Sequence, residues 1–516
     1  TSLFLKNIRE WERFKANDIT LLMKIYTVFV GKPQWEAGWP YLGFDNDALI
    51  KNILKRLGEK FREITFIGGE MIVKFDENLI NTIKNKLKDV DGLIVYTIGQ
   101  YGDEGPVDAA IELVRYGLPT ILANYIYGGD TYFIRIYERV KGLRVLAISS
   151  LGFDELEWAV NILFRVLKLR GKKVLNYTLS QDIRNPSGLI ELLKHESIAE
   201  TEEEVKQFVA AMGFERIEDF AKNSYIDLTG IDQAHQWRRD EERYRKNLQE
   251  IFGIEMVVRD PHEITDEYNK VEEKNADEIA RKWIENASAV SVPREIIRKE
   301  ARLFLALKRL LEKYNADAIT VDCGTLLIAG FLPAYPCAAM CELMNMGAKG
   351  GPESDMDSLI SALLLWYITG RPAYISNHCF DLKNQRVIYL HCCGPSQLYG
   401  PNGPTQRYEI APHGESHFIG ASIGLLDYPE GESVTTIKVS ILERKIAVRS
   451  GRILGATKDE KACHSKLIVE TNARKILDNY DFKTFGWHRV TVLGNWREKI
   501  IAAARLLGLK IVEEDV

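Results

Sequence analysis

The sequence predicts an α/β fold with two doubly wound parallel-sheet domains, followed by a β-rich, barrel-like C-terminal domain. Three observations predict it. Apolar runs of strand length alternate with segments of helical periodicity in the first 170 residues, a second α/β stretch follows, and strand-like runs dominate after about residue 373. A length of 516 residues suits about three domains, which we place at 1–170, 171–372 and 373–516.

The first domain is predicted from its alternating periodicities. Strands are expected at Ile19–Val30, Ile64–Ile67, Gly92–Ile98, Pro119–Ala123 and Arg144–Ser149. Helices are expected at Asp47–Arg62, Glu77–Lys88, Pro106–Arg115 and Glu155–Leu169. Strands separated by helices pair in parallel, and the loops after them carry ligand contacts. The Gly-rich loops 99–105 and 127–130 are candidates, although simple turns are the plainer interpretation.

The second domain begins near Gly171 and contains a charge-dense helical stretch, Ser197–Glu250. We interpret that stretch as a solvated face or an oligomer contact and assign it no chemistry. Strands are then expected at Glu255–Val258 and Ala318–Val321, and helices at Ala276–Ala287, Pro293–Tyr314 and Leu359–Thr369. No GxGxxG or GxxxxGK[ST] motif is present, which argues against a nucleotide-dependent enzyme.

Strand-like runs predict a mainly antiparallel third domain. They lie at Ala373–Ser376, Val387–Cys392, Val434–Leu442, Lys445–Val448 and Lys466–Glu470. The chain then closes with a strand, a helix and a strand at Val490–Leu493, Trp496–Leu507 and Lys510–Val512.

The composition is that of an ordinary globular protein. Hydrophobic residues make up 46% and charged residues 27% of the chain, and the formal net charge is −5. This balance gives no electrostatic reason to expect nucleic acid or an anionic membrane as a partner. No apolar run approaches the roughly 20 residues that span a bilayer, and residues 1–18 do not read as a signal peptide. We expect a cytoplasmic protein.

The residues suited to metal or acid–base chemistry gather in the second half of the chain. All seven cysteines follow residue 320, and six of the nine histidines follow residue 370. An odd number of cysteines favours reduced thiols over a disulfide framework. The adjacent Cys392 and Cys393 lack zinc-finger spacing, so we expect both to be small buried residues. For His413 and His417, a surface loop is the plainer interpretation.

A polar cluster with three carboxylates precedes the apolar helix Leu359–Thr369. Helix capping explains Asp355 or Asp357, because acidic side chains complement the positive end of the helix dipole. Capping explains Glu353 less well, since it stands before the cap beside a Gly-Gly-Pro turn. For Glu353, capping and function both stay open.

Further polar residues are expected at strand ends, where clefts form in α/β and barrel folds. The strand from Ala373 is expected to end in a polar run that begins at Asn377, and His391 ends the next strand. A buried, hydrogen-bonded histidine is the alternative for His391. Near the end of the chain, His488 lies between a Gly-Trp turn and a strand.

Glu353, Asn377 and His488 together would supply oxygen and imidazole ligands. Such ligands suit Mn²⁺, Mg²⁺, Co²⁺ or Zn²⁺ rather than a thiolate site. A cation held in this way can bind two neighbouring sugar oxygens and stabilise an enediolate while a carboxylate moves a proton.

These segments resemble the L-fucose/L-arabinose isomerase family. The resemblance is carried by the stretch from Pro336-Cys337 to Gly370-Arg371-Pro372, above all Pro352-Glu353-Ser354-Asp355, and by Ala373–Asn377, Leu390–Gly394 and Trp487-His488. It implies interconversion of aldoses and ketoses through a cis-enediol with a divalent metal, commonly Mn²⁺. It also implies a homo-oligomer, a trimer or hexamer, whose active sites lie between subunits.

The resemblance also implies roles for individual residues. Glu353 matches a carboxylate that binds metal and acts as acid and base, and His488 matches a C-terminal metal ligand. His391 resembles a histidine of the arabinose-type branch. Asn377 departs from the family, because the fucose-type branch has an acidic ligand there. An amide oxygen can still bind a cation, but it cannot act as a base.

The departure at Asn377 leaves other carboxylates to complete the proton shuttle. Asp355 is the second catalytic candidate, with Asp381 as a further substitute. We expect the sugar to contact His391, Asp381 and Trp487. Under the resemblance, the loop that begins at Gln100 can reach the site from a neighbouring subunit.

Two other functions on the same scaffold stay open. One is hydrolysis of a glycosidic bond by two of Glu353, Asp355 and Asp381, with carboxyl groups about 5–5.5 Å apart for retention and about 6.5–9.5 Å apart for inversion. The other is sugar binding without catalysis, which Asn377 would allow.

Overall fold

The chain divides into two compact units, which are described separately. One comprises Thr1–Leu167 with Ala502–Leu509, and the other Lys168–Ile501 with Lys510–Val516. The computed structural model describes residues 23–36, 39–99, 103–178, 201–211, 215–217, 219, 235–328, 330–413, 420–457, 459 and 461–516. The first unit ends close to the expected boundary at 170. The boundary at 372 falls inside the second unit, and the three-domain division stays a prediction.

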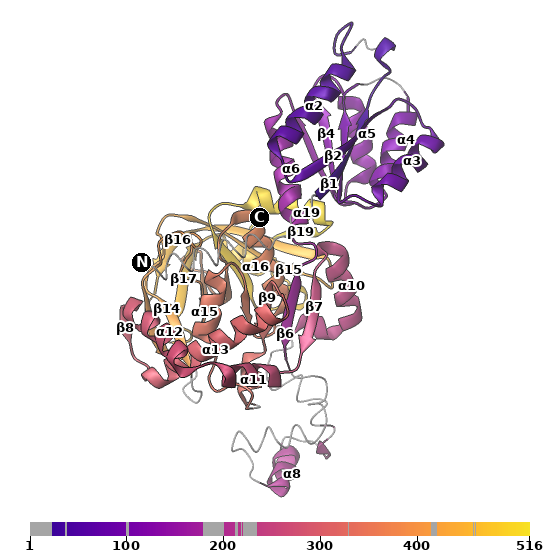
Figure 1. Cartoon of the computed structure of the whole chain (residues 1–516). Coiled ribbons are helices and arrows are strands. Elements are labelled where there is room, and N and C mark those ends of the chain that lie inside the picture. Colours follow the sequence, from indigo (N-terminus) through magenta and orange to yellow (C-terminus); the bar gives the residue numbers. More distant parts are fainter. Residues whose placement is uncertain are drawn as a thin grey trace. The chain divides into compact units, whose positions relative to one another are not determined.

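The first unit is built on a five-stranded parallel sheet with the order β2-β1-β3-β4-β5. Its strands are β1 Met23–Val30, β2 Ile64–Ile72, β3 Gly92–Thr97, β4 Thr120–Tyr125 and β5 Val145–Ser150. Its helices include α2 Asn46–Lys60, α3 Glu77–Leu87, α4 Gly105–Val114, α5 Asp130–Val140 and α6 Asp154–Leu167. Figure 1 shows α2 and α6 on one side of the sheet and α3, α4 and α5 on the other.

The sequence predicts most of the helices and strands of this unit. Strand β3 is buried along its whole length, as expected for a parallel strand covered on both faces. Asp45 and Asp76 accept hydrogen bonds from the first turns of α2 and α3 and so fix where these helices begin. Helix α5 was not expected. Its start explains the loop 127–130, because a Cβ on Gly129 would clash with the carbonyl of Thr97.

The second unit contains a four-stranded parallel sheet with the order β10-β9-β6-β7. Its strands are β6 Lys173–Tyr177, β7 Glu255–Arg259, β9 Ala318–Val321 and β10 Gly350–Pro352. The helices of this part include α10 Glu241–Phe252, α11 His262–Lys270, α12 Glu273–Asn286, α13 Arg294–Lys313, α14 Cys323–Ile328, α15 Cys337–Asn345 and α16 Met356–Thr369. The three-residue strand β10 was not expected, and it places Glu353 directly after a parallel strand.

The charge-dense stretch 197–250 is described only in part. Within it lie α8 Glu202–Ala211, the short 3-10 helix η4 Gln236–Arg239 and most of α10. Among the described helices of the whole chain, none combines the length and the apolar character needed to cross a membrane.

An antiparallel sheet dominates the C-terminal part, as expected. Its order is β15-β18-β11-β12-β17-β16-β19, β15 also pairs with β16, and only β19 joins in parallel. The strands are β11 Tyr374–Asp381, β12 Arg386–His391, β15 Ser433–Ser440, β16 Lys445–Ala456, β17 Ser465–Glu470, β18 Arg489–Leu493 and β19 Lys510–Glu513. Helix α19 covers Arg497–Leu507, and a small sheet is formed by β8 Ala289–Val290, β13 Tyr408–Pro412 and β14 Ala421–Leu425.

The expected end of the strand at Asn377 is wrong. Strand β11 continues to Asp381 and forms a hairpin with β12, so Asn377 lies within the strand and pairs with Leu390. The polar run predicts the end of a strand. Polar side chains are nevertheless tolerated in this half of β11 because it is only partly buried. The end of β12 at His391 is confirmed within one residue.

Candidate metal centre

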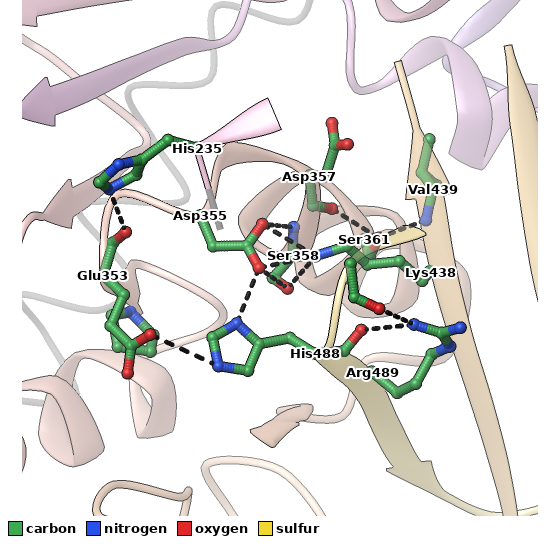
Figure 2. A network of polar contacts seen from close by, with 12 residues as sticks. His235, Glu353, Asp355, Asp357, Ser358, Ser361, Lys438, Val439, His488 and Arg489 are labelled. Carbon is green, nitrogen blue, oxygen red and sulfur yellow. Dashed lines mark hydrogen bonds and ion pairs between the residues drawn. The ribbon is translucent and has the colours of Figure 1, made fainter. Parts of the chain in front are cut away.

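A strained turn presents Glu353. This residue joins β10 to α16, and both Glu353 and Ser354 have positive φ values, 59° and 53°. Residues other than glycine adopt this conformation at a cost, and such strain persists only where the surroundings hold it. His235 Nε2 lies 3.0 Å from the Glu353 carbonyl oxygen (Figure 2), and Trp237 Nε1 donates to the Ser354 carbonyl at 3.1 Å. The Ser354 hydroxyl donates to Asn176 at 2.7 Å.

Three side chains from different elements converge beyond this turn. Glu353 Oε1 lies 3.2 Å from Nε2 of His391, and Glu353 Oε2 lies 3.6 Å from Nε2 of His488. All three residues offer a ligand atom within 4.8 Å of the others. His391 is the last residue of β12, and His488 directly precedes β18. Both histidines are buried, whereas the Glu353 side chain is 28% exposed. We call these three residues the carboxylate–imidazole group.

His488 is oriented by a buried carboxylate. Its Nδ1 lies 2.8 Å from Oδ2 of Asp355, as Figure 2 shows. Because an ionised carboxylate only accepts hydrogen bonds, Nδ1 carries the proton, which leaves Nε2 as the ring atom that can bind a metal. That Nε2 is buried and has no hydrogen-bond partner among the described residues. This arrangement of carboxylate, histidine and open nitrogen is the one that metal-binding histidines adopt.

Lys438 keeps Asp355 ionised. Its ammonium lies 2.8 and 2.7 Å from the two Asp355 oxygens, and all three atoms are fully buried. Asp355 also accepts from the Ser358 amide at 2.8 Å and so begins α16. Burial alone would raise the pKa of Asp355, but Lys438 and His488 hold it well below its usual range. Asp355 therefore acts on the site through His488, and the helix-capping expectation for it is confirmed.

The third carboxyl of the cluster, Asp357, takes no part in the group. It accepts a hydrogen bond from the Tyr244 hydroxyl at 2.9 Å, and Figure 2 shows it pointing away from Glu353. Burial raises its pKa to about 7, with a further contribution from the nearby charge of Asp355. The three acids of one short motif thus have three different environments.

The electrostatics of the group favour a bound cation. Burial would raise the pKa of Glu353, but His488 and His391 lower it to about 2, so its carboxylate is ionised at neutral pH. Burial would lower the pKa of His391, but its hydrogen bond with Glu353 raises it. One carboxylate and two imidazoles are ligands for Mn²⁺, Fe²⁺, Co²⁺ or Zn²⁺. The residues therefore fit a divalent metal without selecting one.

The structure does not bring Asp381 to the group, whereas Asn377 lies near two of its residues in the sheet. Asn377 pairs with Leu390, the residue before His391, and Ser376 pairs with Arg489, the residue after His488. Asp381 pairs with Arg386, five residues before His391 and so about 17 Å along β12. Asp381 instead caps the hairpin turn through Asn384. Their roles in binding stay predictions.

Trp487 does lie beside the group. Its ring centroid is 5.6 Å from that of His488, and its Nε1 is buried with no hydrogen-bond partner among the described residues. An indole N–H in this position can donate to a ligand. Gln100, the fourth expected substrate contact, lies outside the described residues.

Sequence reasoning missed the residues that support the group. Lys438 is the single charged side chain in a strand of apolar and hydroxyl-bearing residues, and this was the available signal, because a lysine buried in a strand requires a partner. His235 and Trp237 gave no such signal, since they reach the Glu353 turn from more than 100 positions away in the chain.

No protein-family model and no curated protein matches the sequence.

Proposed function

We propose that this protein is a metal-dependent aldose–ketose isomerase that works through a cis-enediol and is related to the L-fucose/L-arabinose isomerases. The observation that carries the proposal is the carboxylate–imidazole group, in which Asp355 orients His488 and a strained turn presents Glu353. The proposal includes two doubly wound domains and a barrel-like C-terminal domain. The parallel sheets and the additional β15–β16 pairing support these details.

Glu353 is the proposed acid and base. Its carboxylate is ionised, partly exposed and placed beside both histidines, so it can take the C2 proton of an aldose and return it to C1. A bound divalent metal, which we propose to be Mn²⁺, would polarise the sugar carbonyl and its neighbouring hydroxyl. The buried Trp487 N–H is positioned to donate to a sugar oxygen. Lys438 and Asp355 keep His488 fixed throughout.

Glycoside hydrolysis is less well supported. It requires two carboxyl groups that face the substrate. Asp355 is enclosed by Lys438 and His488, and Asp381 lies at a hairpin turn, so neither is placed to act with Glu353.

The proposed state is a cytoplasmic homo-oligomer, a trimer or hexamer, as the family resemblance implies.

The proposal is tested by proton NMR of pentoses, hexoses and deoxyhexoses in D₂O with Mn²⁺ or with EDTA. We expect the C2 proton signal of one sugar to disappear while its ketose forms, and EDTA to abolish both changes. Glu353→Gln should abolish exchange, whereas Asp381→Asn, the same change of charge at the hairpin turn, should retain it. Bound metal without exchange in any sugar would refute isomerisation, and cleavage of a glycoside would establish the alternative.

A further inference from the structure

A second group of potential ligands contains two cysteines and adjoins the first group in the sequence. Cys337, Cys392 and His413 each offer a ligand atom within 4.8 Å of the others. Cys337 is the first residue of α15, Cys392 directly follows β12, and His413 directly follows β13. Cys463 adds a third sulfur, 3.3 Å from that of Cys392.

The surrounding backbone holds these segments together. The His413 ring stacks on Tyr335, two residues before Cys337, with centroids 3.9 Å apart and planes at 3°. The His413 amide donates to the Gly420 carbonyl at 3.0 Å, and Gly420 forms an isolated bridge with Tyr335. Three segments distant in the sequence are therefore fixed around the two thiols. Cys337 and Cys392 are buried, and His413 is partly buried.

The donor types select a different metal from the first group. Thiolates with one imidazole form the Cys₂His and Cys₃His sets that bind Zn²⁺, whereas Mn²⁺ and Mg²⁺ prefer oxygen. In a tetrahedral site with Zn–S of about 2.3 Å, neighbouring sulfurs lie about 3.8 Å apart. The 3.3 Å between Cys392 and Cys463 is close to that value and far from the roughly 2.05 Å of a disulfide bond. The ligand atoms of Cys337, Cys392 and His413 lie no more than 4.8 Å apart, so tetrahedral spacing is reached with shifts of at most about 1 Å.

We propose that Cys337, Cys392 and His413 bind a Zn²⁺ ion in a closed structural site, with Cys463 as the fourth ligand. The ion would tie the start of α15, the end of β12 and the end of β13 to one point. Because Cys392 follows His391 directly, the same ion fixes the strand end that carries a ligand of the carboxylate–imidazole group. The site stands independently of the proposed isomerase activity.

The test uses the full chain, freed of metal under reducing conditions and titrated with Co²⁺ and then Zn²⁺. Thiolate ligands give Co²⁺ an intense charge-transfer absorption in the near ultraviolet, which oxygen and imidazole ligands do not give. We expect this absorption to saturate with one Co²⁺ per chain and to vanish when Zn²⁺ is added. Cys392→Ser and Cys337→Ser should weaken Zn²⁺ binding more than about tenfold, since even losing an outer partner of a ligand costs that much.

Two kinds of control separate the sites. The absorption should be retained in Cys379→Ser and in Cys341→Ser. Cys379 is an exposed cysteine on β11, and Cys341 is a buried cysteine whose thiol donates a hydrogen bond to the Gly394 carbonyl. His488→Gln should also retain it, while the isomerase assay would lose activity. Where a cysteine variant does not fold, the wild-type protein is tested instead. Bound Zn²⁺ should then protect its thiols from an alkylating reagent. Absent charge transfer with reduced thiols, or a Cys392–Cys463 disulfide that Zn²⁺ does not prevent, would overturn the proposal.

Discussion

The carboxylate–imidazole group meets the cysteine group at consecutive residues, His391 and Cys392, yet the two differ in chemistry and in support. The cysteine group is Cys337, Cys392 and His413, with Cys463 as its proposed fourth ligand. The first has one partly exposed carboxylate and a histidine oriented by a buried ion pair. The second has buried thiols and a histidine held by ring stacking. A partly exposed donor can meet a substrate, whereas a closed set of sulfurs serves to hold structure. One strand end can therefore serve two sites because adjacent residues point in different directions.

The largest expected effect that separates the two groups comes from Glu353→Gln. This change removes the proposed base and an anionic metal ligand, so the isomerisation rate should fall by at least about 10²-fold and up to about 10⁴-fold. Asp381→Asn is the matched control and should stay within about threefold of the wild type. The Co²⁺ absorption of the cysteine group should be unaffected in both variants. Loss of that absorption in Glu353→Gln would mean that the groups are not separate.

Lys438→Met tests the ion pair that supports only the first group. It leaves Asp355 as an uncompensated buried charge, which should lower the free energy of unfolding by about 3–5 kcal/mol. Urea denaturation measures this. Arg407→Ala removes an exposed ion pair with Asp427 and should cost about 0–1 kcal/mol. Equal losses in the two variants would contradict the role of Lys438.

Asp355→Asn tests how the first group orients its histidine. The amide can no longer hold the His488 Nδ1 proton as strongly, so Mn²⁺ affinity should fall by about 10–100-fold. Isothermal titration calorimetry with Mn²⁺ measures this change, and the same titration with Zn²⁺ should show an unchanged cysteine site. An unchanged Mn²⁺ affinity would show that Asp355 serves only to cap α16.

The two groups should also differ in their response to pH. Metal must displace the proton of His391, whose pKa is raised, so Mn²⁺ affinity should fall by about tenfold per pH unit below that pKa. The cysteine group must lose a proton from each thiol, so its metal affinity should fall more steeply. Calorimetry across a pH series gives both slopes, and parallel slopes would contradict the assignment of thiolate ligands.

Stability without metal should change in a still more acidic pH range. Because folding lowers the pKa of Glu353 from 4.5 to about 2, the stabilisation is fully present above about pH 4.5. It is lost as the pH falls through about 2. Glu353→Gln should remove this acid-dependent part of the unfolding free energy, which urea denaturation at several pH values detects.

The smallest effect is expected for Asn377→Asp. Asn377 lies one register position from His391 and close to His488 in the sheet, so the charge of the new carboxylate should raise Mn²⁺ affinity and turnover modestly, by about threefold. A large rise in both would show that Asn377 reaches the metal and that the group has a fourth ligand. Calorimetry and the NMR assay decide between these outcomes.

The local features of the fold could be predicted because they depend on short-range patterns. The strand Ala318–Val321 was placed without error, and the helix before Gly370 followed from its apolar run and its capping acid. Among the features that escaped are helix α5, the strand β10 and the true length of β11. Strand β10 is too short for a pattern of its own and pairs with β9, about 30 residues earlier. The second half of β11 is partly exposed, so polar residues are tolerated there.

The sequence by itself determined which residue types were available: Glu353, His391 and His488 for a hard or borderline cation, and a late cluster of cysteines. Only the tertiary structure decided that Asp355 orients His488 and that Lys438 neutralises Asp355. It also decided that Asp381 lies at a turn and that His413 joins two thiols. The physical reason is that periodicity and capping act over a few residues, whereas a ligand set is defined by distances of a few ångströms between strand ends. Those distances depend on how the sheets pair.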